Sequence, residues 1–458
     1  MHIFVREKKF YKTLIKLAIP ITLQNFITYM VALADNLMVG KLGENAISGV
    51  YMGNQIQTFL QFMVAGIESA VLILATQYWG RKDKESIKRI IGIAMGFVIG
   101  IGVIFTVVTA IFPEEILRLF TNEEMVIKEG LEYVKVLCWS YILFSISQLL
   151  ISAMRSVEKA EIGLYISISA MVINIILNYI LIFGKLGFEP MGVRGAAIAT
   201  LIARIFEMLY AAFYVFVVDK RLNIKFKDLF KGDKGLAYDL IKYGTPVLLG
   251  QIVWSANTLV QSGIIGRMGA EATTAVSIAG MLNNLLFMGI FGLSAALGIL
   301  TGKTIGEGKY ETMKQYAITA QAIFAILGLI SGAVIMALMN PFISLYNINE
   351  GTVLVARQFI AVIAVAAVGR SYQATCLAGL VKAGGDVSFV FINDTVFVFL
   401  VVLPSAILAM FVFNAPAWVV YACLQSDQIL KCFVAVVKIN RFKWMKKLTR
   451  SNQVTEEI

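Results

Sequence analysis

The chain has 458 residues, of which 59% are hydrophobic and only 15% are charged, and its mean hydropathy is +0.78. So little charge excludes an ordinary soluble domain of this length, in which about a quarter of the residues are charged. The net charge of +11 comes mainly from Lys and Arg residues in connections on one predicted side of a membrane. We interpret it as a topology signal and expect no nucleic-acid partner.

Apolar segments of about 20 residues or more, long enough to span a bilayer, recur along the whole chain. We predict an all-α integral membrane protein with twelve transmembrane helices, six in each half. In chain order the predicted spans are residues 13–39, 46–78, 90–112, 131–154, 162–184, 192–218, 239–265, 273–302, 315–339, 352–380, 387–412 and 415–437. With an even number of spans in each half, we expect a multi-pass plasma-membrane protein with both termini cytoplasmic.

The two halves of the chain are similar at one fixed offset in residue number, the offset that takes Pro20 to Pro246. The shared residues are mainly prolines and glycines, which we expect to bend helices or end them in tight turns. Besides the two prolines they include the pairs Gly40 and Gly266, Gly43 and Gly269, and Gly66 and Gly292. A duplicated membrane chain of this kind predicts a transporter built from two pseudo-symmetric six-helix bundles.

The repeat predicts three regions. Residues 1–218 form an N-terminal bundle, residues 219–238 form a cytoplasmic linker, and residues 239–458 form a C-terminal bundle with a basic cytoplasmic tail. The linker mixes charged residues with Phe226, Leu229 and Phe230. We therefore expect an amphipathic segment that lies on the membrane surface.

Cysteine and histidine usage argues against several kinds of chemistry. The four cysteines fall in apolar segments and are interpreted as small core residues rather than disulfides or metal ligands: Cys138, Cys376, Cys423 and Cys432. His2 is the only histidine, and no phosphate-binding loop is present, so we expect neither ATP hydrolysis nor a cofactor. An intramembrane enzyme, the alternative from another class, needs a reactive cluster at one depth, which Asp35 and Glu68 do not form.

Polar residues that the two halves do not share are the candidates for function. Asp35 falls opposite Gln261, and an acid inside a spanning helix costs at least about 2.5–3.5 kcal/mol unless it faces a cavity or a partner. Counting helical rise from the helix ends places Asn174, Asn178 and Thr200 at a similar depth. We predict that these four residues form an ion-coupling site in the outer half of the N-terminal bundle. A structural hydrogen-bonding role for Asp35 is the alternative.

Two further intramembrane acids are assigned to a substrate chamber. Glu68, opposite Ser294, lies near the midplane and is interpreted as a cation-binding acid or a second titrating site; a salt bridge to a neighbouring helix is the alternative. Asp394 lies at the depth of Arg370, and a buried pair between them is the simplest prediction, with a chamber role as the alternative.

Other side chains complete these predictions. Arg204 with Glu207, and Asp427 with Lys431, have the spacing of ion pairs on a helix surface. Aromatic and methionine side chains that could line a chamber for flat cations are Tyr29, Met30, Phe59 and Met63.

Several stretches together resemble the multidrug and toxic compound extrusion (MATE) family, closest to its bacterial DinF-like branch. They are Pro20 leading through Asp35 to Gly40–Gly43, Gln77–Gly80, Asn174–Tyr179, Met191–Thr200, Gly266–Ala272, Gly302-Lys303 and Lys443-Trp444. The resemblance implies a V-shaped pair of six-helix bundles and a secondary antiporter. It implies export of amphipathic or cationic drugs, including antibiotics, in exchange for protons or sodium ions.

In the DinF-like branch the acid at Asp35 is the coupling residue, and a second acid is common where this chain has Asn178. We expect a monomer whose partners are small organic cations and membrane lipids; Na⁺ at Asp35 and protonation of Asp35 both remain open. The alternative transporter is a lipid-linked oligosaccharide flippase of the wider superfamily. That function needs a groove with several basic residues, for which only Arg204 and Arg370 are available.

Overall fold

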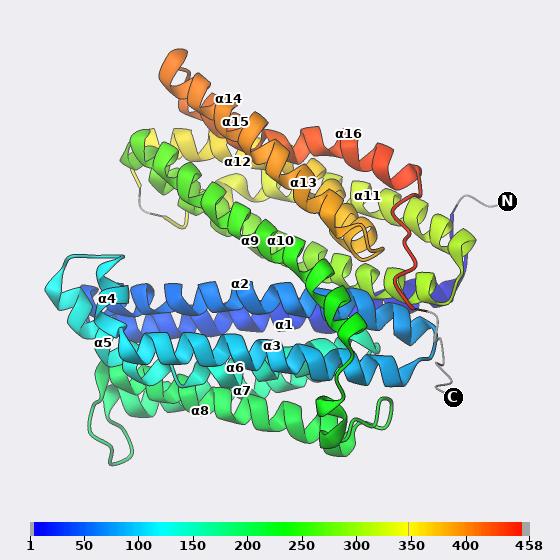
Figure 1. The fold of residues 1–458 in the computed structure, drawn as a ribbon. Helices are drawn as coiled ribbons and strands as arrows, with labels where there is room; N and C mark the ends of the chain where they lie inside the picture. Colours follow the sequence, from blue (N-terminus) through cyan, green and yellow to red (C-terminus); the bar gives the residue numbers. More distant parts are fainter. Residues whose placement is uncertain (1–3, 347, 451–458) are drawn as a thin grey trace, which may run out of the picture. The chain divides into compact units, whose positions relative to one another are not determined.

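A computed structural model describes residues 4–346 and 348–450, so that His2 lies outside the described part of the chain. The first repeat forms eight α-helices and a π-helical turn. Its helices are coloured from blue to green in Figure 1. These are α1 (Lys8–Gly40), α2 (Glu44–Gly80), α3 (Lys84–Ile111), α4 (Pro113–Arg118), α5 (Glu124–Leu137), α6 (Ser140–Ser156), α7 (Glu161–Phe183), α8 (Gly192–Phe213) and η1 (Tyr214–Val218).

A short 3-10 helix, η2 (Phe226–Phe230), leads into the second repeat. The elements of the second repeat are α9 (Lys234–Arg267), α10 (Ala270–Gly306), α11 (Tyr310–Ile343), α12 (Glu350–Cys376), η3 (Leu377–Lys382), α13 (Val387–Phe397), η4 (Val398–Val402), α14 (Leu403–Ile407), η5 (Leu408–Val412), α15 (Ala417–Leu424) and α16 (Ser426–Asn440).

Every predicted span coincides with helix over most of its length, which confirms the all-α membrane fold. The span predicted at 131–154 is not one straight helix, because α5 and α6 meet at an angle of 54°. Within the described residues, ten helices are long and apolar enough to cross a membrane, or eleven with the bent pair counted as one span. The twelfth, α9, is more polar because it carries Gln251, Asn257 and Gln261.

The predicted glycine turns are confirmed at equivalent places in both repeats. Gly43 precedes α2 with φ 118°, and Gly269 precedes α10 with φ 99°, a region that L side chains rarely adopt. Each donates its backbone N–H to the carbonyl of an earlier glycine, Gly40 at 3.4 Å and Gly266 at 3.3 Å. These four shared glycines therefore serve the fold.

Packing divides the described residues into two units whose boundaries fall inside helices. One unit, here the N-terminal unit, is Leu23–Leu248; the other, the C-terminal unit, combines the described residues up to Thr22 with those from Leu249 onward. The two boundaries are related by the offset of the repeat, and each lies just after a shared proline, Pro20 in α1 and Pro246 in α9. The first part of each helix thus packs with the other repeat. The predicted regions 1–218, 219–238 and 239–458 follow the sequence repeats and stay a prediction.

Two shared glycines allow the first part of α1 and of α9 to pack with helices of the other repeat. In the N-terminal unit, a Cβ added to Gly66 of α2 would lie 3.0 Å from Cβ of Leu248. In the C-terminal unit, a Cβ added to Gly292 of α10 would overlap Thr22. Thr22 and Leu248 are themselves equivalent positions of the two repeats. Glycine is needed at these positions because the helices approach closely there.

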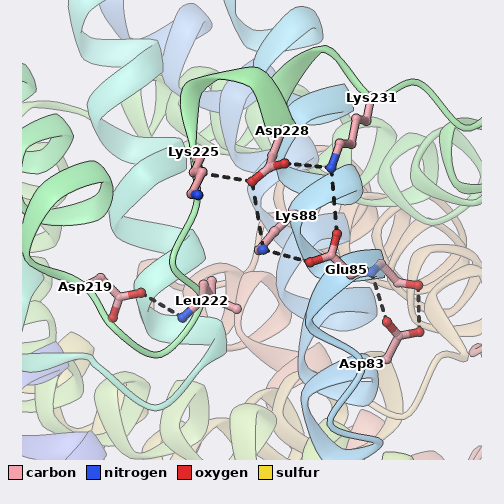
Figure 2. A network of polar contacts seen from close by, with 9 residues as sticks. Asp83, Glu85, Lys88, Asp219, Leu222, Lys225, Asp228 and Lys231 are labelled. Atoms are coloured by element: carbon pink, nitrogen blue, oxygen red, sulfur yellow. Dashed lines mark hydrogen bonds and ion pairs between the residues drawn. The ribbon is translucent and has the colours of Figure 1, made fainter.

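The linker is folded against the first turns of α3 (Figure 2). Asp228 of η2 is 3% exposed, and its carboxylate accepts hydrogen bonds from Lys231 Nζ at 2.8 Å and from the Lys225 backbone N–H at 3.0 Å. These hydrogen bonds lower the pKa of Asp228 to about 2. Phe226 and Phe230 point outward, with 68% and 75% of their surface exposed. The segment is amphipathic as expected, and its place on a membrane surface stays a prediction.

The chain after α16 is anchored to the connection between η3 and α13. Trp444 is fully buried, stands against Gly384, and donates its indole N–H to the Ile439 carbonyl at 2.9 Å. Asp386 accepts from Lys438 Nζ at 2.6 Å and Lys446 Nζ at 2.7 Å. Burial acts to raise the pKa of Asp386, but these two hydrogen bonds outweigh it and hold the pKa below its usual range.

All four cysteines are free. Cys138, in the turn between α5 and α6, and Cys376, at the end of α12, are buried, and Cys423 and Cys432 are half-buried. They pack as small apolar side chains, in agreement with the prediction.

Candidate functional site

Asp35 and the three polar residues predicted to join it converge in the N-terminal unit. Asn178 Nδ2 of α7 donates to Asp35 Oδ1 of α1 at 2.5 Å and to Asn174 Oδ1 at 3.2 Å. Asn174 Nδ2 in turn donates to Thr200 Oγ1 of α8 at 3.4 Å. Asn174 and Asn178 are one helical turn apart and so lie on the same face of α7. The predicted convergence is confirmed, whereas the ion-coupling role of the cluster stays a proposal.

One oxygen of this cluster has no partner among the described residues. Asn178 is fully buried, and its Oδ1 accepts no hydrogen bond. A buried unsatisfied carbonyl oxygen costs about 1–3 kcal/mol, so its presence calls for an explanation. With the Asp35 carboxylate close by, the cluster offers the oxygen donors that hard cations prefer. It is equally suited to a proton on Asp35.

Tyr133 of α5 extends the cluster and is a residue that sequence reasoning missed. Its side chain is 4% exposed, its hydroxyl donates to Asn54 Oδ1 of α2 at 3.1 Å, and it lies beside Thr200 and near Asp35. The repeat carries a signal that could have found it, because the equivalent position of the second half is Phe359, which lacks the hydroxyl.

The ion pair of Arg204 with Glu207 is present but does not lie on a helix surface. The two side chains meet at 2.5 Å, and Glu207 is only 3% exposed. Because α6 packs against α8, Glu207 also accepts hydrogen bonds from Ser147 Oγ at 3.1 Å and Gln148 Nε2 at 2.9 Å. The guanidinium lies over the ring of Phe144, 4.9 Å from its centroid. The pair is thus part of the interior of the N-terminal unit.

Glu68 is half-buried in α2 and forms no ion pair within the described chain. The predicted alternative of a salt bridge to a neighbouring helix is therefore not formed. Arg155 of α6 is the basic residue close enough to act on Glu68 electrostatically, but its guanidinium donates to Gln24 Oε1 at 2.6 Å. The Glu68 carboxylate is therefore left without a bonded partner in the described chain.

Asp394 and Arg370 do not pair, and this prediction is wrong. Asp394 binds Lys431 Nζ of α16 at 2.9 Å, and Lys431 also binds Asp427 at 3.1 Å, which confirms the pair predicted within α16. Arg370 lies instead over the ring of Phe287, 4.7 Å from its centroid. Depth along separate helices could not reveal this, because α16 packs against both α12 and η4 and brings Lys431 to Asp394. Lys431 is 5% exposed, so its pair with Asp427 is buried rather than on a helix surface.

The other predicted chamber residues lie on α1 and α2 of the N-terminal unit. Tyr29, Met30 and Met63 are half-buried, and Phe59 is 51% exposed. Within the described chain no hydrogen bond or ring contact joins them to Asp35 or Glu68. Their lining of a chamber stays a proposal.

A groove of about 820 Å³ lies elsewhere, between α11, α12 and α16 of the C-terminal unit. Its lining is almost wholly apolar, from residues such as Leu329, Val365 and Ile429, and it contains none of the predicted site residues. Size alone therefore does not identify the site, since a cation needs a carboxylate or a ring of oxygens.

Comparison with known proteins agrees with the duplicated architecture. A family model described as MatE matches residues 20–180 and matches again at residues 246–408. The two matches begin at Pro20 and Pro246, at the offset found in the sequence. Together they cover more than half of the chain.

The chain is similar to the probable multidrug resistance protein NorM of Thermotoga maritima, with 27% identity over 338 residues, 73% of this chain and 72% of that protein. It is also similar to the probable multidrug resistance protein YoeA of Bacillus subtilis, with 25% identity over 347 residues, 75% and 74% of the two chains. The crystal structure of MATE in the bent conformation matches with a TM-score of 0.86 at 19% identity, covering 94% of this chain and 96% of that one. That likeness shows the fold of twelve helices in two bundles. The chain belongs to the MATE family of multidrug efflux transporters.

Proposed function

We propose that the chain is a secondary active antiporter that exports amphipathic or cationic drugs and toxins in exchange for protons or sodium ions. It works by alternating access between its two bundles in the plasma membrane, with both termini cytoplasmic. Asp35 carries the coupling ion. The protein needs no cofactor and acts as a monomer.

One observation carries this proposal above the others. A carboxylate on α1 is hydrogen-bonded to Asn178, whose own Oδ1 is buried without a partner among residues 4–346 and 348–450. A sodium ion at Asp35 would supply that oxygen with a positive partner, and a proton on Asp35 would supply a hydrogen-bond donor. Either ion removes the negative charge that α1 otherwise holds inside the bilayer. Binding therefore changes the energy of the helix that runs from one unit to the other.

The substrate side of the proposal assigns Glu68 and the rings and thioethers of α1 and α2 to the chamber. Asp394 is left out of it, because Lys431 already binds its carboxylate. Carboxylates attract organic cations, and aromatic faces and methionines adapt to flat apolar ones. The flippase alternative is not favoured, because the similar proteins are named for multidrug resistance. Arg204 is already paired with Glu207, which leaves few basic side chains for a phosphate-bearing substrate.

The test is ethidium uptake into inside-out vesicles that hold either an acidic or a sodium-rich lumen. Wild-type protein should accumulate ethidium under one of the two gradients, and the effective gradient identifies the ion. Asp35→Asn should abolish gradient-driven uptake at unchanged expression, because the amide cannot bind a proton and no longer neutralises a sodium ion.

The matched control is Asp233→Asn, an aspartate outside the proposed site. Asp233 caps α9 by accepting from the Leu236 backbone N–H, and asparagine caps equally well. The variant also loses a pair with Arg89 at 3.6 Å, which is partly exposed and worth little. Its uptake should equal that of the wild type. Wild-type rates in Asp35→Asn, or no response of the wild type to either gradient, would overturn the proposal.

A further inference from the structure

Glu68, Arg155 and Gln24 form a polar cluster in the N-terminal unit that is separate from the Asp35 cluster. They come from α2, α6 and the part of α1 that follows Pro20. The Ser152 hydroxyl lies 3.5 Å from the backbone carbonyl of Glu68, so α6 and α2 are in close contact here. Because its three residues come from three different helices, the cluster depends on the positions of α1, α2 and α6.

Arg155 is held in an arrangement that leaves most of its bonding capacity unused. Its Nη2 donates to Gln24 Oε1 at 2.6 Å, and its Nε is buried without a partner in the described chain. A guanidinium binds a carboxylate best, through two parallel hydrogen bonds. A half-buried arginine that is bonded to one neutral amide and whose Nε is buried is thus under-satisfied, although the Glu68 carboxylate is near enough to attract it.

Gln24 is fixed in place by close packing. It is 4% exposed, and a Cβ added to Gly163 of α7 would lie 2.6 Å from its Oε1. Gly163 therefore leaves just enough space for the amide that binds Arg155. Gln24 also lies one helical turn after Pro20 and shortly after Thr22, where α1 passes from one unit to the other.

We propose that Gln24 holds Arg155 away from Glu68, so that Glu68 stays open to an organic cation, and that Arg155 displaces this cation when Gln24 withdraws. Arg155 then acts as a built-in competitor for one carboxylate. Movement of α1 beyond Pro20 carries Gln24 with it and exchanges the amide for Glu68 as the partner of Arg155. The idea rests on the proposed export of cations and adds a release step to it.

The test is a set of ethidium affinities measured by fluorescence on purified full-length protein in detergent. Gln24→Leu should weaken ethidium binding about tenfold, which is about 1.4 kcal/mol, because Arg155 is freed to occupy Glu68. Arg155→Gln should bind at least as tightly as the wild type. Adding Gln24→Leu to Arg155→Gln should then have no further effect, a non-additivity that a double-mutant cycle detects.

Gln24→Glu is the matched variant that still holds Arg155 away from Glu68. It offers Arg155 a stronger partner at the same place, so ethidium affinity should stay at or above the wild-type value. Glu68→Gln should bind ethidium weakly whatever residue stands at position 155. If Gln24→Leu weakens binding equally with and without Arg155, or if Arg155→Gln itself weakens binding tenfold, the proposal is wrong.

Asp35→Asn separates this inference from the proposed antiport. It should lose gradient-driven uptake in vesicles while keeping the pattern of affinities among the Gln24 and Arg155 variants. Failure of the antiport proposal would appear in the vesicles alone, and failure of the release device would appear in the affinities alone.

Discussion

Asp35 and Glu68 of the N-terminal unit fall opposite Gln261 and Ser294 of the C-terminal unit, at the offset that relates the repeats. The interiors differ accordingly. The intramembrane charges of the N-terminal unit are three acids, Asp35, Glu68 and Glu207, and two bases, Arg155 and Arg204. Those of the C-terminal unit are two acids, Asp394 and Asp427, and three bases, Arg370, Lys382 and Lys431. The first set carries an excess of negative charge and the second an excess of positive charge.

The partners of these acids differ as much as their number. In the C-terminal unit, Lys431 binds both carboxylates, at 2.9 Å and 3.1 Å, so each acid already has a cation. In the N-terminal unit, Asp35 has only the amide of Asn178, and Glu68 has no bonded partner in the described chain. An added cation or proton gains most where no cation is already present. The comparison therefore favours the N-terminal unit as the place of ion and cation binding.

The largest expected effect comes from moving the coupling acid to the other unit. The double variant Asp35→Asn with Gln261→Asp should show no gradient-driven ethidium uptake, although it restores the number of intramembrane acids. The corresponding stretch of the second repeat, residues 400–406, contains no asparagine or glutamine and so provides no amide for the new carboxylate. Uptake at the wild-type rate in vesicles would show that the amide cluster is dispensable and would remove the distinction between the units.

Removing Lys431 should destabilise the C-terminal unit. Lys431→Met breaks the buried pair with Asp427, which costs about 3–5 kcal/mol, whereas the loss at Asp394, with 44% of its side chain exposed, adds little. We expect a lower midpoint of thermal unfolding in detergent. Adding Asp427→Asn should restore part of the loss, because one unpaired charge is then gone. An unchanged midpoint in Lys431→Met would mean that the ion pairs of Lys431 with Asp394 and Asp427 do not stabilise the fold.

The close contacts at the shared glycines should differ in cost between the units. Gly292→Ala places a Cβ that overlaps Thr22 Oγ1 and lies 2.9 Å from the Thr22 backbone nitrogen, whereas Gly66→Ala meets Leu248 Cβ at 3.0 Å and no other atom more closely. Overpacking of this kind costs about 1–3 kcal/mol, and more atoms must move to make room at Gly292. Gly292→Ala should therefore lower the thermal midpoint more than Gly66→Ala. Equal midpoints would show that α1 shifts freely at Thr22.

The smallest expected effect is the pH dependence of stability that comes from Asp228 in the linker and Asp386 in the connection between η3 and α13. The lowered pKa of Asp228, about 2, means that its contribution to stability is present above the unfolded value of about 3.9 and is lost as the pH falls toward 2. The thermal midpoint of the wild type should fall slightly more than that of Asp228→Asn between pH 5 and pH 3. The lowered pKa of Asp386 predicts the same sign for Asp386→Asn.

The sequence by itself determined the membrane class, the duplicated twelve-helix plan and the family. Hydropathy places the spans because the bilayer sets their length, and the constant offset between the halves reveals which prolines and glycines serve the fold. It also predicted the convergence of Asp35 with Asn174, Asn178 and Thr200, because helical rise allowed a common depth and the family resemblance pointed to the same residues.

The tertiary structure alone decided which side chains at one depth are neighbours. Depth made Arg370 the obvious partner of Asp394, but α16 brings Lys431 there instead. Nothing in the sequence indicated that Gln24, Arg155 and Glu68 form one cluster, or that the packing boundary crosses α1 and α9 just beyond their prolines. The sequence gives the depth of a residue along its helix. The direction in which its side chain points, and the side chains that it meets, depend on how several helices pack together.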